Sequence, residues 1–400
     1  MQALDDIRVL EVGDFISGAH CGKLLADFGA EVLKVELPAG DSVRRYGPFP
    51  GSNVSRETSG LHLFLNANKR SITLDYRTPR GLDLLKQLVG RHDIFITNLD
   101  LPTRERLGLT YEDVRAAGDE RLIYTALTPF GDSGPRARWK AYDINVWGGA
   151  GQAVKFGEPD REPLNKPLSE IDSLMGLNAA GATMLAVMAR DMQGAPGQYI
   201  DISGMDCLAQ LMNGLSLNAM IFEGRPFPSR NGFKSMVVVP WGVYPCRDGY
   251  VEVFCPMARH WEQFARVLGV PALMDPAFSD RQHRQLHEPE IEAVMLPWLA
   301  ARTKAELVEI FTREKLPFHP INTIADVVES DQLKEREYFV EVDHPVAGKW
   351  KYPGAPVKTS FNGWQLRHPA PALGQHTAEV LQDLGIDEDT MAELERSGTI

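Results

Sequence analysis

Short apolar runs alternate with amphipathic stretches along the first half of the chain. Five runs have the length and composition of buried strands, at residues 7–12, 31–36, 71–75, 93–97 and 122–127. Helix-like segments lie between them, at residues 16–28, 79–90 and 110–117. A strand that is followed by a crossover helix and a further strand pairs in parallel. The alternation therefore predicts a doubly wound α/β sheet.

The second half is organised differently. An apolar, helix-like run at 174–192 is followed by a strand at 198–203 and a further apolar stretch at 205–220. After a turn-rich segment, a hairpin is expected at 241–254, because its Asp-Gly turn favours positive backbone angles. Helices are then expected at 261–268, 290–301, 304–314, 377–384 and 387–397.

These elements predict a doubly wound parallel, Rossmann-like large domain and a small α+β domain. The division runs as follows: large domain 1–222, linker 223–232, small domain 233–325, return linker 326–357, and C-terminal helices over 358–400 that pack on the large domain.

Composition places the chain among soluble globular proteins of enzyme size, since 44% of its 400 residues are hydrophobic and 24% are charged. The N-terminus is acidic, and no apolar run approaches the roughly 18 residues that span a bilayer. We therefore expect a cytoplasmic protein. A formal net charge of -12 argues against nonspecific binding to nucleic acid or to an anionic membrane. The cysteines are scattered without a C-x-x-C pair, so free thiols are expected at Cys21, Cys207, Cys246 and Cys255.

Ligands of doubly wound sheets lie beyond the carboxyl ends of the strands. Polar and flexible residues gather there, at 13–14, 37–38, 76–77, 98–99 and 128–131. A nicotinamide dinucleotide site is disfavoured, because residues 13–18 lack the G-x-G-x-x-G spacing and bulky Phe15 and Ile16 would keep a pyrophosphate from the backbone.

Asp172 is the most informative single residue. It is a lone carboxylate ahead of the apolar run 174–192, where the chain changes direction. Aspartate in this place is ordinarily an N-cap that satisfies free backbone N–H groups. It is also a candidate nucleophile, and the two roles are compatible.

Seven segments together resemble the class III coenzyme A transferases, the family that includes formyl-CoA transferase, carnitine CoA-transferase and α-methylacyl-CoA racemase. The segments follow one another in family order over nearly the whole chain: 24–36, 68–75, 106–111, 130–135, 197–203, 244–249 and 371–376. The resemblance implies that Asp172 is a covalent nucleophile. Such a carboxylate attacks an acyl-CoA thioester to give a mixed anhydride, and the CoA thiolate then forms an aspartyl-CoA thioester. Coenzyme A is thus a substrate, and no permanently bound cofactor or metal is expected.

The resemblance also implies a set of coenzyme A contacts. Arg77, Arg106 and Lys140 match positions that contact the nucleotide or the phosphates, while Ser17, Leu74 and Tyr142 match positions near the pantetheine or the adenine. Asn98 and Leu99, at a strand end, complete the expected cradle. Each cation taken alone is more often a solvated surface charge than a ligand contact.

An oxyanion site and an acyl pocket are expected as well. Backbone N–H groups at Gly148, Gly149 and Gly151, or between 237 and 242, are candidate donors to the oxyanion, although glycines often simply mark turns. For the acyl group the candidates are Phe233, Met236, Trp241 and Tyr244, which favour a larger aliphatic, aromatic or dicarboxylic group over formyl, or else belong to the core.

Departures from the family pattern bear on specificity and on the type of reaction. Formyl-CoA transferase carries glutamine where this chain has Ile16 and arginine where it has Leu37, so its small-acid specificity is not expected here. The racemase carries a histidine before its Asp-Ile-Asn string, where this chain has Tyr142, and a phenol with a pKa near 10 is a poor base at neutral pH. Transfer therefore outranks racemisation.

A noncatalytic acyl-CoA binding protein with the same fold is the third alternative, and the retained Asp172 argues against it. The resemblance further implies an interlocked homodimer. The expected partners are thus acyl-CoA and carboxylic acid substrates and a second copy of the chain, with no nucleic acid and no membrane.

Overall fold

The chain was analysed as a computed structural model that describes residues 2–51, 53–166, 169–211, 217–224, 230, 232, 234, 238–361 and 363–400. It divides into two compact units. The large unit comprises Met1–Ala150, Lys166–Asn213 and Glu335–Ile400, and the small unit comprises Gly151–Asn165 and Gly214–Lys334. The sequence-based division did not anticipate that residues 151–165 leave the large unit.

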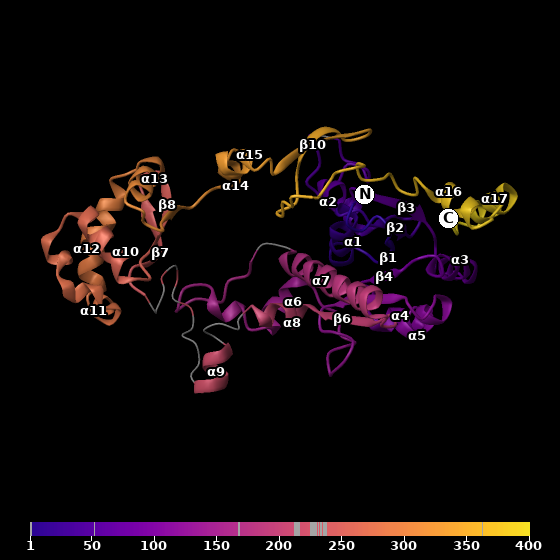
Figure 1. Cartoon of the computed structure of the whole chain (residues 1–400), viewed down its shortest axis with the longest axis horizontal. Helices are drawn as coiled ribbons and strands as arrows, with labels where there is room; N and C mark the ends of the chain where they lie inside the picture. The colour runs from indigo at the N-terminus through magenta and orange to yellow at the C-terminus, as the bar shows by residue number, and fades with distance from the viewer. Residues whose placement is uncertain are drawn as a thin grey trace. The chain divides into compact units, whose positions relative to one another are not determined.

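A six-stranded sheet, all of whose pairings are parallel, forms the centre of the large unit (Figure 1). Its order is β3-β2-β1-β4-β5-β6, which is the doubly wound order. The strands are β1 Arg8–Val12, β2 Glu31–Glu36, β3 Lys69–Thr73, β4 Ile94–Thr97, β5 Ile123–Thr128 and β6 Tyr199–Ser203. The predicted α/β class with a parallel sheet is confirmed. The strand order reverses between β1 and β4, where such sheets open a crevice for ligands.

Helices cover both faces of this sheet. They are α1 Ser17–Asp27, α2 Gly60–Leu65, α3 Pro79–Val89, α4 Leu101–Leu107, α5 Tyr111–Ala117, α6 Asp143–Gly149, α7 Glu170–Gln193 and α8 Gly204–Gln210, with the 3₁₀ turn η1 Ser42–Arg45. Alternate strand residues such as Leu10, Leu33 and Phe95 pack with α3 and α5 in one buried cluster. On the opposite face α1 packs against α7, and Thr183 of α7 hydrogen-bonds Thr125 of β5 at 2.8 Å.

The last segment of the chain returns to the large unit. It contains the antiparallel hairpin β10 Phe339–His344 and β11 Gly348–Pro353, and the helices α16 Thr377–Asp383 and α17 Glu388–Arg396. Helix α15 Asp331–Glu335 precedes it, and all of its residues but the last belong to the small unit. The terminal helices share the core cluster of the sheet, through Val380, Leu381 and Leu394. The expected return linker 326–357 thus holds regular structure over much of its length.

The small unit has its own sheet and core. Strands β7 Trp241–Cys246, β8 Gly249–Phe254 and β9 His319–Pro320 are antiparallel, and β7 and β8 form the predicted hairpin. The helices are α9 Asn218–Glu223, α10 Ala258–Leu268, α11 Arg281–Leu286, α12 Glu288–Ala300, α13 Lys304–Arg313 and α14 Ile324–Val328, with the 3₁₀ turns η2 Ala153–Lys155, η4 Pro271–Met274 and η5 Pro276–Ser279. Its core is built around Trp261, Phe264 and Val251.

Helix α7 has the length and hydropathy of a membrane span, and it is the one helix in the described part of the chain that meets this test. The sequence analysis found no such run. The helix packs against α1, β5 and β6, as a core helix of a globular protein does. Length and composition alone are therefore weak evidence for a membrane role.

Candidate active site

A cavity of about 470 Å³ lies at the carboxyl ends of the parallel strands, within the large unit. Its walls come from the loop after β1, the start of α1, the ends of β4 and β5, and the first turns of α6 and α7. The lining residues are Phe15, Ile16, Ser17, Tyr46, Gly47, Leu61, Asn98, Leu127, Pro129, Ala141, Tyr142, Asp143, Val146, Ser169, Ile171, Asp172 and Met175. Four of the residues proposed from sequence meet here: Ser17, Asn98, Tyr142 and Asp172.

The side chain of Asn98 fixes the loop between β1 and α1 through hydrogen bonds. Its Oδ1 accepts from Asp14 N at 2.9 Å, and its Nδ2 donates to Asp14 O at 2.6 Å and to Ser17 Oγ at 3.0 Å. A Cβ at Gly13 would lie 2.3 Å from Asn98 Oδ1, so only glycine permits this approach. Both N–H bonds of the amide are used within the protein, and Asn98 shapes the cavity wall.

Asp172 is the third residue of α7 and not its N-cap. The helix begins after Ser169, which has a φ of 68° and whose side chain makes no capping hydrogen bond. The carboxylate of Asp143, from the first turn of α6, accepts from Ile171 N at 3.0 Å instead. The N-cap interpretation of Asp172 is therefore wrong, because Asp172 lies inside the first turn and the N–H of Ile171 donates to a distant aspartate.

The surroundings of Asp172 favour a carboxylate of unusual basicity. Burial and, to a smaller extent, the nearby charge of Asp143 raise its pKa to about 6, although Lys166 acts in the opposite direction. Lys166 is held by an ion pair with Glu170 at 2.8 Å. Among the described residues none forms a hydrogen bond with the Asp172 carboxylate. An anion at a helix N-terminus is ordinarily stabilised, so the desolvation outweighs the helix dipole here.

The first turn of α7 is fixed against α1. His20 Nδ1 lies 2.9 Å from Ser173 O, and burial lowers the pKa of His20, so the neutral ring carries its proton on Nδ1 and donates to this carbonyl. Gly176 permits the contact, because a Cβ there would lie 2.8 Å from His20 Cβ and 2.9 Å from Ser17 O. No role of His20 or Asp143 is evident from the sequence, where the only signal for Asp143 is its place beside Tyr142.

Replacing Asp172 with asparagine should stabilise the folded protein at pH 7. The pKa of Asp172 is raised by folding from 3.8 to about 6. Such an acid contributes stability below its unfolded pKa and loses it as pH rises through the folded pKa, so ionised Asp172 opposes folding at pH 7. We expect Asp172→Asn to gain about 1–2 kcal/mol after allowance for partial exposure. Urea denaturation of wild type and Asp172→Asn at pH 7 and pH 3.5 measures the difference in their free energies of unfolding. Equal stabilities of the two proteins at pH 7 would contradict the interpretation that ionised Asp172 is desolvated in the fold.

The remaining coenzyme A candidates lie outside this cavity. Leu74 is fully buried in the sheet's core, so its side chain offers no surface to a ligand, and Leu99 packs against the same cluster. Arg77 is exposed and pairs with Asp75 at 2.7 Å. Arg106 and Lys140 are exposed, while Tyr142 is 82% exposed at the cavity rim.

The expected oxyanion donors are not supported in the large unit. Gly148 and Gly149 occupy the last turn of α6, where the unpaired backbone groups are carbonyls. Gly151 belongs to the small unit, as do the described residues of the segment 237–242, in which Pro240 has no N–H. Phe233, Met236 and Val237 lie outside the described residues. Tyr244 is buried in the core of the small unit, and Trp241 packs on Phe254.

A search of the described residues finds no group of histidine, cysteine and carboxylate side chains that could hold a metal ion. All four cysteines are buried thiols.

The chain matches the family model described as CoA-transferase family III over residues 4–377. It is 30% identical to a succinate–glutarate CoA-transferase of Agrobacterium fabrum, covering 97% of each chain. It is 33% identical to a succinyl-CoA–D-citramalate CoA-transferase of Chloroflexus aurantiacus, over 99% of this chain and 98% of the relative. A CAIB/BAIF family protein from Brucella suis has the same fold, with a TM-score of 0.84 and 29% identity over 96% of this chain and 99% of that chain. With its parallel sheet and its cavity at the strand ends, the chain belongs to CoA-transferase family III and is a class III CoA-transferase.

Proposed function

We propose that this enzyme moves coenzyme A from an acyl-CoA donor to a carboxylic acid through covalent intermediates on Asp172. The observation that carries the proposal is a carboxylate with a raised pKa and no hydrogen-bond partner among the described residues, facing a cavity at the strand ends. Desolvation makes a carboxylate more nucleophilic, because no donor has to be removed before it attacks. With a pKa of about 6, Asp172 is still mostly ionised at neutral pH.

The reaction balances without any other cofactor. An oxygen of Asp172 attacks the thioester carbonyl, the carbon–sulfur bond breaks, and coenzyme A leaves as the thiolate from a mixed anhydride. The thiolate attacks the carbonyl of Asp172, which releases the donor acid and leaves an aspartyl-CoA thioester. An acceptor carboxylate then repeats both steps in reverse and departs as its own CoA ester.

Coenzyme A is proposed to bind across the same strand ends. Ser17 and Tyr142 line the cavity beside Asp172, and Asn98 holds the loop that carries Ser17. Arg77 follows β3 and Arg106 lies in α4 after β4, while Lys140 precedes α6, so all three cations follow carboxyl ends of strands. They supply local positive charge for phosphates on an acidic protein. Leu74 and Leu99 support the cradle from the core.

Racemisation is less well supported by the geometry. It needs a base that removes the α proton of the acyl group. The described cavity lining contains no histidine, and His20 uses Nδ1 to hold Ser173 O. A noncatalytic binding role leaves the raised pKa of Asp172 unexplained.

A homodimer is proposed, interlocked as in the family resemblance. Helix α7 carries a stripe of exposed apolar side chains at Leu177, Leu185, Met188 and Met192, spaced to lie along one face. Exposed apolar side chains that share one helix face are typical of a protein interface, and a second copy of this chain is the proposed cover. The enzyme is proposed to act in the cytoplasm.

Trapping the covalent intermediates tests the chemistry. The enzyme is incubated with acyl-CoA donors of both apolar and dicarboxylic type, since relatives are named for succinate and glutarate, and is then treated with hydroxylamine or borohydride. Mass spectrometry should find the modification on the peptide that contains Asp172. A working enzyme with an unmodified Asp172 would overturn the mechanism, and exchange of the α proton with D₂O without CoA transfer would indicate racemisation.

A further inference from the structure

We propose that Asp41, a buried carboxylate after β2, is a positioning residue of the active site. Its hydrogen bonds hold the loop after β1, residues 13–17, in the conformation on which the cavity wall and the start of α7 depend. This inference rests on the proposed function, because it names what keeps the proposed nucleophile Asp172 in place. Asp41 is not among the described residues that line the cavity, so it acts through the backbone that it binds.

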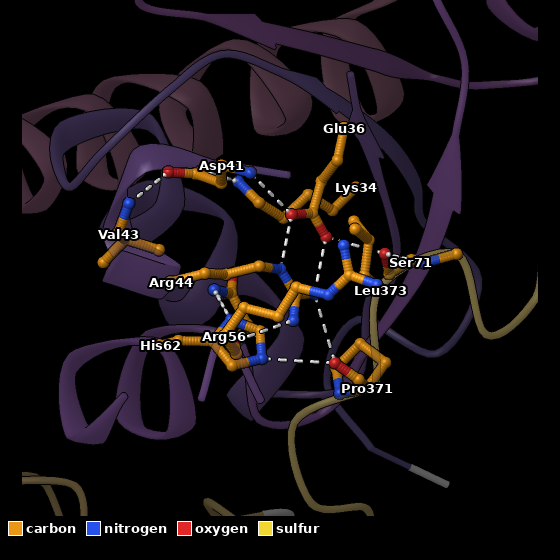
Figure 2. A network of polar contacts seen from close by, with 12 residues as sticks. Lys34, Glu36, Asp41, Val43, Arg44, Arg56, His62, Ser71, Pro371 and Leu373 are labelled. Atoms are coloured by element: carbon orange, nitrogen blue, oxygen red, sulfur yellow. Dashed lines mark hydrogen bonds and ion pairs between the residues drawn. The ribbon is translucent and has the colours of Figure 1, made fainter. Parts of the chain in front are cut away.

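The loop after β1 and the segment after β2 are joined by hydrogen bonds in both directions. Phe15 N donates to Asp41 Oδ1 at 2.9 Å, and Ser42 N donates to Asp14 Oδ1 at 2.7 Å. Val43 N donates to the same oxygen of Asp41 at 2.8 Å, as the N-terminus of η1 requires (Figure 2). One carboxylate oxygen thus binds the loop and the 3₁₀ turn at the same time.

The backbone conformation of the loop explains why it needs this contact. Phe15 has a φ of 67°, a left-handed conformation that is unfavourable for an aromatic residue and persists only where neighbouring contacts hold it. Asn98 binds Asp14 and Ser17 from the end of β4, on either side of Phe15. The N–H of Phe15 itself is bound by Asp41. Loss of that acceptor should therefore let the strained residue relax and displace the loop.

Asp41 is itself fixed by buried charges that belong to three strands of the sheet. Its side chain is fully buried, and its Oδ2 lies 2.7 Å from Lys34 Nζ of β2. Lys34 also pairs with Glu11 of β1 at 2.7 Å, and Glu11 pairs with Lys69 of β3 at 2.8 Å. The N–H of Asp41 donates to Glu36 Oε2 at 3.0 Å (Figure 2). The acceptor for the loop is thus anchored to the sheet, as a preorganised site requires.

The loop leads directly into α1, and the start of α1 contacts the first turns of α7. His20 Nδ1 donates to Ser173 O at 2.9 Å. A Cβ at Gly176 would lie 2.9 Å from Ser17 O, so the two helices are in close backbone contact here. Asp172 directly precedes Ser173 in the same turn. A displaced loop should therefore displace Asp172, and an error of about 1 Å in such a group can lower a rate about 100-fold.

Two substitutions of Asp41 separate the role of its hydrogen bonds from that of its buried charge. Asp41→Asn keeps an oxygen that can accept from Phe15 N and Val43 N, whereas Asp41→Ala has none. Both variants lose the ion pair with Lys34. Glu11→Gln is the matched control, because it removes the charge of the other carboxylate that pairs with Lys34, and Glu11 lies in β1 and not in the loop.

Hydrogen exchange of the free full-length enzyme tests the loop without any substrate. In Asp41→Ala, peptides that cover 13–20 and 170–177 should exchange about tenfold faster than in wild type, because a lost buried hydrogen bond favours local opening by about that factor. In Asp41→Asn and Glu11→Gln the same peptides should stay within about threefold of wild type. Equal acceleration in all three variants, or none in Asp41→Ala, would overturn the proposal.

Asp14→Ala gives a second test on an exposed side chain, for the case that Asp41→Ala does not fold. It removes only the reciprocal bond from Ser42 N, and exchange of the peptide 13–20 should rise by about threefold or more. Unchanged exchange in Asp14→Ala would contradict the inferred link between the two segments.

Transfer kinetics measure the consequence for the reaction. Succinyl-, glutaryl- and benzoyl-CoA are supplied as donors, each with its own labelled free acid as acceptor. We expect kcat of Asp41→Ala to fall about 100-fold, while Asp41→Asn and Glu11→Gln keep kcat within about threefold of wild type. Equal losses in the three variants would reduce Asp41 to a structural role. A wild type that turns over no donor, or an active Asp172→Ala, would end the proposed function, and the exchange data would still decide the role of Asp41.

Discussion

Replacing Asp172 with alanine should lower the rate of CoA transfer by about 10⁴-fold or more, as expected when a covalent nucleophile is removed. The geometry gives the reason, because the described part of the cavity offers only Asp143 as another carboxylate, and Asp143 already accepts from Ile171 N at 3.0 Å. Exchange of labelled acid into acyl-CoA measures the effect. Binding of coenzyme A should persist, since the proposed contacts at the strand ends do not involve Asp172.

Asp143→Asn is the matched control for this variant. Its amide oxygen can still accept from Ile171 N, so the start of α7 should keep its conformation, while the charge that raises the pKa of Asp172 is removed. This variant should retain measurable transfer, with the acidic limb of its pH–rate profile moved to lower pH. If Asp172→Ala retains turnover, or if Asp143→Asn loses it as completely as Asp172→Ala, the assignment of the nucleophile is wrong.

The sheet was predictable from sequence because its signal is local. Apolar runs at 7–12, 31–36 and 93–97 contain β1, β2 and β4. Helical segments lie between the strands, and a helix that crosses over from one strand to the next makes the two strands parallel. The start of α7 was not predictable in this way. One of its N-terminal N–H groups, that of Ile171, donates to Asp143, a residue distant along the chain, whereas a local capping rule assigns the nearest aspartate.

In the candidate site, too, contacts between residues distant along the chain could not be predicted from local sequence. Asn98 was placed correctly at a strand end, but its partners are Asp14 and Ser17, which only the parallel pairing of β1 with β4 brings close. Leu74 follows β3 as a ligand contact would, yet the chain terminus covers this edge, where Asp75 N donates to Thr399 O at 2.6 Å. Segments distant along the chain pack over some strand ends, and they determine which side chains there remain accessible to a ligand.

Two neighbouring arginines of α4 differ in burial in a way that the sequence does not show. Arg104 and Arg106 are two residues apart in one short helix, and the family resemblance singled out Arg106. Arg104 is buried and holds Asp132 at 2.5 Å, while Arg106 is exposed. Asp132 belongs to the loop after β5, so Arg104 anchors the chain that leads to Tyr142. Arg106 is thus the arginine of this pair that the fold leaves exposed, as its proposed contact with a phosphate requires.

Arg44→Met should cost about 3–5 kcal/mol of folding free energy, because it leaves a buried carboxylate without its partner. Arg44 and Glu36 are both almost fully buried, and they join through Nε to Oε2 and Nη2 to Oε1, each at 2.7 Å (Figure 2). Nη1 also meets Glu57 at 2.8 Å. Glu36 further accepts from Asp41 N at 3.0 Å, so this network lies under the segment that carries Tyr46.

The pH dependence of the loss identifies its origin. The hydrogen bonds and charge of Arg44 lower the pKa of Glu36 to about 2, below its usual value of 4.5, despite burial. A depressed pKa stabilises the fold above pH 4.5, and this contribution disappears as pH falls toward 2. The difference in the free energy of unfolding between wild type and Arg44→Met, measured by urea denaturation, should therefore become smaller as pH falls from 4.5 toward 2. Arg121→Met, which breaks an exposed pair with Asp191, should cost less than about 1 kcal/mol. A loss in Arg44→Met no larger than in Arg121→Met would show that this buried network does not hold the segment in place.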